Sequence, residues 1–483
     1  MSHTPPTGSQ LTDEQVAKLG ALARRGVSLL VIRTIIVQLT VFGGQIWLAR
    51  LLAPKDFGVF AIAQFALLVF TQLGSAGLGS ALIQKEHEPT QLELSSLWWL
   101  QLALGVTTAG LMWFTAPLAF YVWPDLPSDA IWLLRAMSLN VLFTALRIIP
   151  TMLLERHLHY NRLAVLEVLL QVPYYATAIT LAYLNYGVMA FALALLAQGA
   201  CSVVGAFALR PWKPSWTFDR GGLGPIVRFG ANYQFKHIIG LLFGALTPVY
   251  VGRTLGQTQL GLLDWSQRTA FFPLRLVEVM TRVSFPLYSR LQNNRAALAS
   301  TLERSLQISA MGIALFVSLM LALGPELVRT LYTDKWLPAL PTLYIYAAGI
   351  SLGFMCPLVF PVFDAMGKPE IATKFSISWT VGIIVLAPLM CARWGAPGFA
   401  LGYCIPMVLG NLATLVYLKR KLPEVRIGRP LLPSAVAALA VVAAGLALPA
   451  TWAAHPLGLA ALVVLLAALF LGVVATIDRT ALT

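Results

Sequence analysis

Long apolar segments separated by short polar ones make up most of this chain. Each segment holds about twenty predominantly apolar residues, the length that an α-helix needs to cross a bilayer. The segments cover residues 27–49, 58–83, 95–122, 129–152, 163–184, 188–209, 226–251, 260–289, 302–323, 338–363, 371–392, 397–418, 431–450 and 456–476. The connections between them are short, so we expect no soluble domain. The pattern predicts an all-α membrane protein with about fourteen transmembrane helices.

Composition and charge favour the same class of protein. Hydrophobic residues make up 58% of the 483 residues and charged residues only 11%, whereas soluble domains carry about 25% charged residues. If the N-terminus is cytoplasmic, 21 of the 34 Lys and Arg residues fall in predicted cytoplasmic segments and 6 in external ones. This asymmetry follows the positive-inside rule and accounts for most of the net charge of +14. We therefore expect a multi-pass protein of the cell (inner) membrane, with both termini cytoplasmic and no nucleic-acid partner.

An internal repeat divides the chain into two halves. At an offset of 203 residues, Arg50–Gly58 (RLLAPKDFG) matches Arg253–Gly261 (RTLGQTQLG), and at an offset of 208 Gly187 matches Gly395. Each half holds an even number of spans, so the halves have the same orientation and are related by an axis along the membrane normal. The repeat predicts two pseudo-symmetric six-helix bundles followed by two C-terminal helices.

The repeat and the polar breaks between spans predict the domain boundaries. The expected parts are a cytoplasmic N-terminal segment (1–26), an N-lobe of spans 1–6 (27–210), a cytoplasmic linker (211–225), a C-lobe of spans 7–12 (226–418), a basic cytoplasmic linker (419–430) and spans 13–14 (431–476). The four cysteines lie in apolar stretches without metal-ligand spacing. We expect them to be free, packed thiols, and we expect neither a metal site nor a cofactor.

One predicted span, the stretch 262–290, carries more charge than a lipid-facing helix tolerates. Its charged residues are Asp264, Arg268, Arg275, Glu278 and Arg282. At about 100° per residue, these five positions fall within a sector of roughly 80°. An arginine at the bilayer centre costs ~2.5–3.5 kcal/mol on insertion scales, so three on a lipid-facing side would be hard to insert. The stripe is therefore predicted to face protein or water and to line a polar cavity.

Two further cations occupy equivalent positions in the repeat. Arg33 in span one matches Lys236 in span seven at the offset of 203 residues. Two cations that face each other across a pseudo-two-fold axis suit an anionic headgroup, and guanidinium groups bind phosphate bidentately while staying charged. The candidate substrate-binding cations are Arg33, Lys236, Arg268, Arg275 and Arg282.

A structural role for the charged stripe is the alternative. Asp264 and Arg268, like Glu278 and Arg282, are spaced i,i+4, and Arg275 and Glu278 are spaced i,i+3, so the charges can neutralise one another within one helix. Asp264 and Glu278 are lower-ranked candidates for the site, either as partners of the cations or as sites for a coupling ion.

Span four and a proline in span eight add three expectations. Arg135 and Arg147 lie near opposite ends of span four and on different faces, so we expect them to extend toward the membrane surface, with a role in binding as the lesser alternative. Pro273 falls inside the charged span and predicts a kink there.

Two motifs resemble a known family. Ala49–Val59 (ARLLAPKDFGV) and Gly77–Gln84 (GLGSALIQ), together with basic residues in spans one, seven and eight, resemble the polysaccharide and lipid-linked oligosaccharide flippases of the multidrug/oligosaccharidyl-lipid/polysaccharide exporter superfamily. The resemblance implies that a prenyl-pyrophosphate-linked repeat unit is moved from the cytoplasmic to the external leaflet by alternating access, for exopolysaccharide, capsule or O-antigen synthesis. It also implies membrane lipids and a lipid-linked oligosaccharide as partners, with a polysaccharide polymerase and export machinery as further candidates.

Two other functions compete with this interpretation. A cation or drug antiporter of the same superfamily would need an unpaired carboxylate deep in span one or seven, where this chain has Arg33 and Lys236. A membrane enzyme acting on lipid-linked sugars would need a sizeable external loop or a positioned acid/base cluster, and the sequence has neither pattern. We therefore predict that the protein is not an enzyme and has no catalytic residue.

Overall fold

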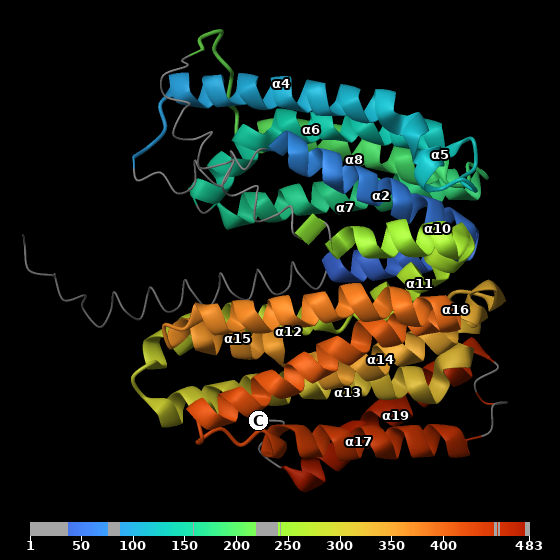
Figure 1. Cartoon of the computed structure of the whole chain (residues 1–483), viewed down its shortest axis with the longest axis vertical. Coiled ribbons are helices and arrows are strands. Elements are labelled where there is room, and N and C mark those ends of the chain that lie inside the picture. The colour runs from blue at the N-terminus through green and yellow to red at the C-terminus, as the bar shows by residue number, and fades with distance from the viewer. Residues whose placement is uncertain are drawn as a thin grey trace, which may run out of the picture. The chain divides into compact units, whose positions relative to one another are not determined.

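The fold is described from a computed structural model of the chain, which covers residues 37–75, 87–157, 159–218, 240–241, 243–448, 452 and 455–478. Every regular element in these ranges is a helix, as the sequence predicts (Figure 1). Within the same ranges, ten helical segments are long and apolar enough to cross a membrane. The all-α membrane class is confirmed, and the count of fourteen spans stays a prediction.

The described residues form two compact units. The first contains residues 37–51, 67–75, 87–116, 132–157 and 159–218, and the second contains 52–66, 117–131, 240–241, 243–448, 452 and 455–478. One helix, α2 (Pro54–Ser75), contributes its first part to the second unit and its last part to the first. The lobe boundaries predicted from the repeat stay predictions.

The first unit is built from long apolar helices. These are residues 37–51, the end of α2, α4 (Gln91–Thr115), α6 (Ala130–Arg156, from its third residue), α7 (Tyr160–Tyr183) and α8 (Met189–Leu209). The start of α4 is fixed by a capping box, in which the Thr90 hydroxyl accepts a bond from the Glu93 N–H and the Glu93 carboxylate accepts one from the Thr90 N–H. Two backbone donors at the helix start are thereby satisfied.

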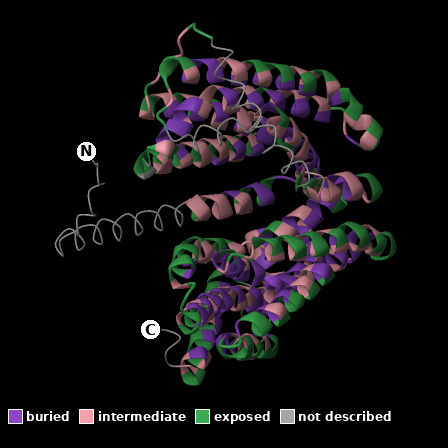
Figure 2. Cartoon of the chain, turned by 60° about the vertical axis from the view of Figure 1, so that its left-hand side comes forward, coloured by how far each residue is buried: buried purple, intermediate pink, exposed green. Residues whose placement is uncertain are grey.

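The second unit contains the first part of α2 and all the remaining helices. They are η1 (Ala116–Leu118, from its second residue), α5 (Ala119–Val122), η2 (Leu246–Val251), α10 (Gly252–Thr254), α11 (Gly256–Ala270), α12 (Leu274–Leu291), α13 (Arg295–Leu331), η3 (Asp334–Ala339), α14 (Leu340–Gly353), α15 (Cys356–Ala365), α16 (Pro369–Lys421), α17 (Gly428–Ala447) and α19 (Pro456–Ile477). Buried positions lie on the sides of these helices that face one another (Figure 2).

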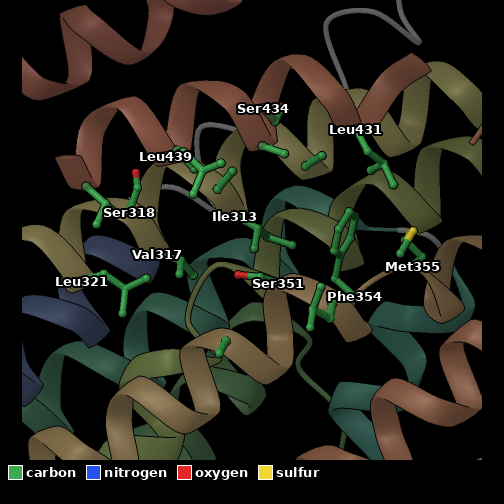
Figure 3. Close-up of a pocket in the computed structure, with 17 residues that line it drawn as sticks. Ile313, Val317, Ser318, Leu321, Ser351, Phe354, Met355, Leu431, Ser434 and Leu439 are labelled. Atoms are coloured by element: carbon green, nitrogen blue, oxygen red, sulfur yellow. The ribbon is translucent and has the colours of Figure 1, made fainter. Parts of the chain in front are cut away.

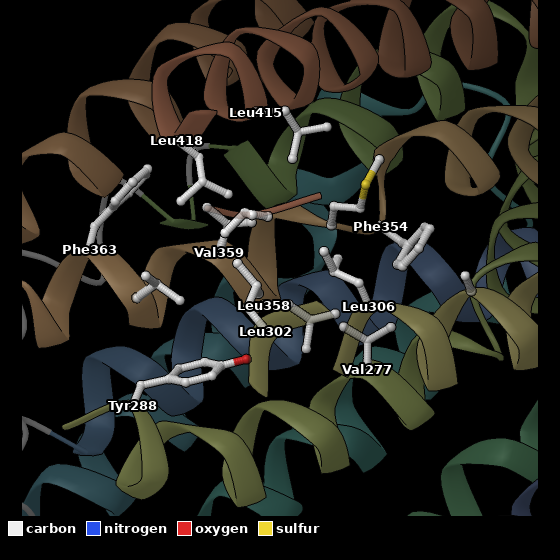
Figure 4. Packing of buried hydrophobic residues seen from close by; sticks show 14 of the residues in the cluster. Val277, Tyr288, Leu302, Leu306, Phe354, Leu358, Val359, Phe363, Leu415 and Leu418 are labelled. Carbon is white, nitrogen blue, oxygen red and sulfur yellow. The ribbon is translucent and has the colours of Figure 1, made fainter. Parts of the chain in front are cut away.

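The core of the second unit is a layer of branched aliphatic and aromatic side chains. Leu302 on α13, Leu358 and Val359 on α15 and Leu418 on α16 are all 0% exposed and point toward one another (Figure 4). Lipid tails are as apolar as leucine, so burial from water contributes little to this packing inside a bilayer. Close van der Waals contact must therefore hold these helices together.

Two helix junctions support the internal repeat. The predicted spans 371–392 and 397–418 meet inside α16 at Gly395, whose φ of 62° interrupts the helical geometry. Gly187, its partner at the offset of 208 residues, joins α7 to α8 and has a φ of 54°. Glycine adopts positive φ without the steric cost that a Cβ atom brings. The matched glycines therefore share a positive φ at equivalent turns.

The predicted span 260–289 is not one continuous helix. The kink expected at Pro273 is present, but it is a break that separates α11 from α12. Proline has no N–H to donate, and the neighbouring Phe272 N–H bonds instead to the Thr269 carbonyl oxygen at 3.3 Å, in a tighter i→i−3 pattern. The single-helix prediction is wrong at this turn.

Truncation of the core should test the packing argument. We expect Leu302→Ala to destabilise the protein by an amount toward the lower end of the about 2–5 kcal/mol range of buried leucine truncations, because mainly the cavity contribution remains in a bilayer. Leu446→Ala, at a position on α17 that is 73% exposed, is the matched control and should leave stability unchanged. Thermal unfolding of the purified protein in detergent measures both, and equal stability of the two variants would contradict the argument.

Candidate functional site

The predicted charged stripe lies on α11 and α12, in the second unit. Both helices pack against membrane-spanning neighbours, α11 against α14 and α12 against α13 and α15. On α11, Leu263 and Ser266 are fully buried, whereas the Asp264 side chain is 19% exposed and that of Arg268 44% exposed. The charged side chains therefore lie at the edge of the packed surface, with access to what surrounds it.

Arg268 is held by oxygen atoms from two helices. Its Nε donates to Asp264 Oδ2 at 2.6 Å, one turn earlier on α11, and its Nη2 donates to Gln64 Oε1 on α2 at 2.9 Å. The planar guanidinium presents its donors in a fixed fork. Two anchored bonds therefore determine its direction, and the side chain is pre-oriented rather than mobile.

The second pair of charges is more exposed. Arg275 Nη1 donates to both carboxylate oxygens of Glu278, at 3.1 and 3.2 Å, and the two side chains are 58% and 53% exposed. An exposed ion pair contributes ~0–1 kcal/mol in water. Of the two partners that the spacing allowed, Glu278 pairs with Arg275, and Arg282 makes no ion pair with a described residue.

The charged residues of α12 lie opposite its buried face. The helix buries Val277, Ser284 and Tyr288, and it exposes Arg275, Glu278 and Arg282. At about 100° per residue the two sets are centred roughly 130° apart. Arg275, Glu278 and Arg282 therefore share one face of α12, whereas the prediction of one face for all five charges assumed a continuous helix, which the break at Pro273 interrupts. Such a face is costly against lipid, so it must meet water or polar protein groups.

Neutralisation within the stripe is only partial. Three arginines stand against two carboxylates, so one net positive charge remains on the face. The ion pairs on this face are what the structural alternative predicts, in which the charges neutralise one another. The remaining charge and the exposed guanidinium groups still favour an anionic ligand.

Two predicted site residues belong to the first unit. The guanidinium of Arg135 lies over the rings of Trp132 and Trp113, 5.1 and 5.5 Å from their centroids. Such cation–π contacts stabilise an arginine near a membrane surface. Arg147 is half-buried in α6 and interacts electrostatically with Glu155. Their roles stay predictions, as do those of Arg33 and Lys236, which lie outside the described residues.

An apolar cavity was not predicted from the sequence. It has a volume of about 500 Å³ and lies between α13, α14 and α17 (Figure 3). Its walls are mainly aliphatic, and Ser318, Ser351 and Ser434 also line it. A cavity of this kind accommodates hydrocarbon chains rather than charged groups. The sequence signal for this cavity is the small residues on α17, such as Ala435 and Ala438. That signal is not specific, because small residues are common between packed membrane helices.

Gln64 was a second omission. At the offset of 203 residues Gln64 corresponds to Gln267, and a polar residue in an apolar span is itself a signal. The sequence could not show that Gln64 contacts Arg268. Among the described residues, no group of three or more His, Cys, Asp or Glu side chains could hold a metal ion. The four cysteines are free thiols, as predicted, but only three of them are buried: Cys201 is exposed, so the prediction that all four are packed is wrong there.

These observations define a multi-pass α-helical membrane protein that carries a charged helical face. Residues 47–341, more than half of the chain, match the family described as polysaccharide biosynthesis protein. The chain belongs to this family, which confirms the family-level prediction.

Curated relatives and a solved structure agree with this assignment. The succinoglycan biosynthesis transport protein ExoT of Rhizobium meliloti (strain 1021) is 25% identical over 372 residues, 76% of this chain and 74% of ExoT. The lipopolysaccharide biosynthesis protein WzxC of Escherichia coli (strain K12) is 24% identical over 408 residues, 82% of this chain and 78% of WzxC. The structure of the lipid II flippase MurJ in an inward closed conformation matches 93% of this chain and 99% of MurJ with a TM-score of 0.72 and 16% identity. This likeness shows a shared fold.

The Asp264–Arg268 pair should contribute more to stability than the exposed pair on α12. We expect Arg268→Gln to destabilise the protein by about 1–3 kcal/mol, because it leaves the largely buried Asp264 carboxylate without its charged partner. Asp264→Asn added to Arg268→Gln should recover part of this loss. Arg275→Gln with Glu278→Gln is the matched pair, and its coupling should stay below about 1 kcal/mol. Double-mutant cycles from thermal unfolding measure both couplings, and equal values would contradict the expectation.

Proposed function

We propose that the protein is a flippase that moves a prenyl-pyrophosphate-linked oligosaccharide repeat unit from the cytoplasmic to the external leaflet. The observation that carries the proposal is the charged face of α11 and α12 in a multi-pass membrane protein of this family. A transported lipid headgroup needs a polar route, and this face supplies one within a unit that is otherwise apolar.

The chemistry of the face suits a pyrophosphate group. Arg268, Arg275 and Arg282 supply guanidinium donors, and each can bind phosphate oxygens bidentately. We include Arg33 and Lys236 in the same site, from their place in the repeat. An anionic headgroup must compete with Asp264 and Glu278 for two of the arginines. Binding of moderate strength is what a transporter requires, since the ligand must also leave.

Names of the relatives narrow the cargo to polysaccharide precursors. ExoT is named for succinoglycan transport, WzxC for lipopolysaccharide biosynthesis, and the structural neighbour MurJ is a lipid II flippase. We infer a lipid-linked sugar as substrate and alternating access as the mechanism. We also infer location in the cell (inner) membrane with both termini cytoplasmic, and a polysaccharide polymerase and export machinery as downstream partners.

A cation antiporter fits the charges less well. Its binding carboxylate must be available to the transported cation, but Asp264 is bonded to Arg268 and Glu278 is bonded to Arg275. The net charge of the face is positive and repels a cation. We therefore propose transport of an anionic lipid, with no covalent chemistry on the sugar.

Charge reversal tests the proposal. Arg268→Glu and Arg275→Glu should each slow the flipping of lipid-linked repeat units by roughly 10- to 100-fold, because each loses charge-assisted bonds of about 1.5–3 kcal/mol to the pyrophosphate. Intact cells should then accumulate these units on the cytoplasmic leaflet, which a leaflet-specific assay of the lipid-linked sugar measures.

A matched control is available at the end of α13. Arg329 is ion-paired with Asp334, and its side chain is 58% exposed, as is that of Arg275. Arg329→Glu should leave flipping near the wild-type rate at similar protein levels. Wild-type flipping by well-expressed Arg268→Glu and Arg275→Glu variants would instead make the stripe a structural ladder of ion pairs.

A further inference from the structure

Two glycines bring α2 and α11 into backbone contact. A Cβ atom on Gly58 of α2 would overlap the carbonyl group of Gln257, and a Cβ atom on Gly261 of α11 would overlap the carbonyl oxygen of Pro54. No side chain fits at either position unless the helices move apart. We call the contact of Pro54–Gly58 with Gln257–Gly261 the glycine crossing.

The glycine crossing has the symmetry of the internal repeat. The offset of 203 residues that relates Gly58 to Gly261 also relates Pro54 to Gln257. The glycine of each helix therefore contacts the backbone of the other helix at the residue one turn before that helix's own glycine. Two contacts that are images of each other place the pseudo-two-fold axis between these helices.

The crossing lies at one end of the charged face. Both helices begin at the end that the positive-inside rule predicts to be external, and both contribute their first turn to the contact. Arg268 Nη2 on α11 donates a hydrogen bond to Gln64 Oε1 on α2, at 2.9 Å. Gln64 and Arg268 are six and seven residues further along, about 9–10 Å deeper at the helical rise. The crossing therefore lies over the candidate site on its predicted external side.

Aromatic side chains close around the crossing. Trp336 of η3 is 0% exposed, and its ring contacts those of Phe57 on α2 and Trp265 on α11, with centroids 5.1 Å apart in each case. Lys335, also on η3, interacts electrostatically with Asp56. The starts of α2 and α11 are thus joined by packing of backbone and aromatic rings. Contacts of this kind can part without the breaking of a covalent bond.

We propose that the glycine crossing is the external gate of the transport route. It holds α2 against α11 in the externally closed state, and it must open for the cargo to leave toward the outer leaflet. This inference rests on the proposed function, because alternating access requires such a contact to part. It adds the residues that form the gate, and it explains why glycine occupies both repeat-equivalent positions.

Thiol labelling tests the gate without any substrate. Gln257 is 6% exposed, so Gln257→Cys is a protected reporter, placed in protein whose exposed Cys201 is replaced by serine. A membrane-impermeant maleimide is applied from outside to the full chain in right-side-out vesicles. Gly58→Ala with Gly261→Ala should raise the labelling rate about tenfold by shifting the population toward the open state.

Gly110→Ala is the matched control. Gly110 lies in α4 with nothing within 4 Å of an added Cβ atom, so the control should label at the unaltered rate. If the double glycine variant is monodisperse and its reporter stays as protected as in the control, the crossing is not a gate. If labelling rises but the wild-type protein moves no lipid-linked oligosaccharide, the gate stands and the proposed function fails.

A cross-link provides the second test, which does not depend on the glycine variants folding. Asp56→Cys with Lys335→Cys can be joined by a short, cleavable bifunctional thiol reagent. Joining should abolish flipping of lipid-linked repeat units in vesicles, and cleavage should restore it. The same variant without reagent is the control, and unimpaired flipping by the joined protein would overturn the proposal.

Discussion

The cost of charge inside a bilayer is the constraint on which the rest of this structure depends. An isolated arginine in the hydrocarbon region is expensive, so it must be paired, shielded by aromatic rings or given access to water. The chain uses all three solutions. Arg268 is paired with Asp264, Arg135 lies against two tryptophan rings, and Arg275 and Arg282 share one exposed face of α12. This constraint applies to the charged face whatever the protein transports.

Partial pairing leaves the site usable. If Arg268 were fully buried with Asp264, desolvation would make exchange of its partner costly. Its side chain is instead 44% exposed and also bonded to the neutral amide of Gln64. Replacing these partners of Arg268 by phosphate oxygens therefore costs less free energy, and so does the reverse exchange when the phosphate leaves. A ligand that must be both captured and released requires this balance, so in the proposed site the two carboxylates would weaken binding of an anion without preventing it.

Local patterns in the sequence predicted the helices better than the contacts between them. Apolar length located α8 and α19 to within one or two residues, and the 3.6-residue period placed the charges of α12 on one face. The break at Pro273 was expected only as a kink, because the tightened bonds of the preceding turn depend on the surrounding packing. The Arg268–Gln64 bond joins residues 204 positions apart in the sequence, so no pattern within a single helix could predict it. The apolar cavity likewise arises from how three helices pack.

The two halves of the repeat match at the glycine crossing but differ at the charged positions. At the offset of 203 residues, Gly58 and Gly261 are the same residue, but the charged positions of α11 and α12 are matched by uncharged ones, since Ala61 stands for Asp264 and Phe65 for Arg268. A contact that opens and closes between two halves benefits from equal partners, because each glycine needs the other helix's backbone at the same depth. Binding an anionic headgroup makes no such demand, and one half can supply the charge. The repeat is therefore retained where the backbones of α2 and α11 meet, and it is lost at the charged positions that we propose bind the cargo.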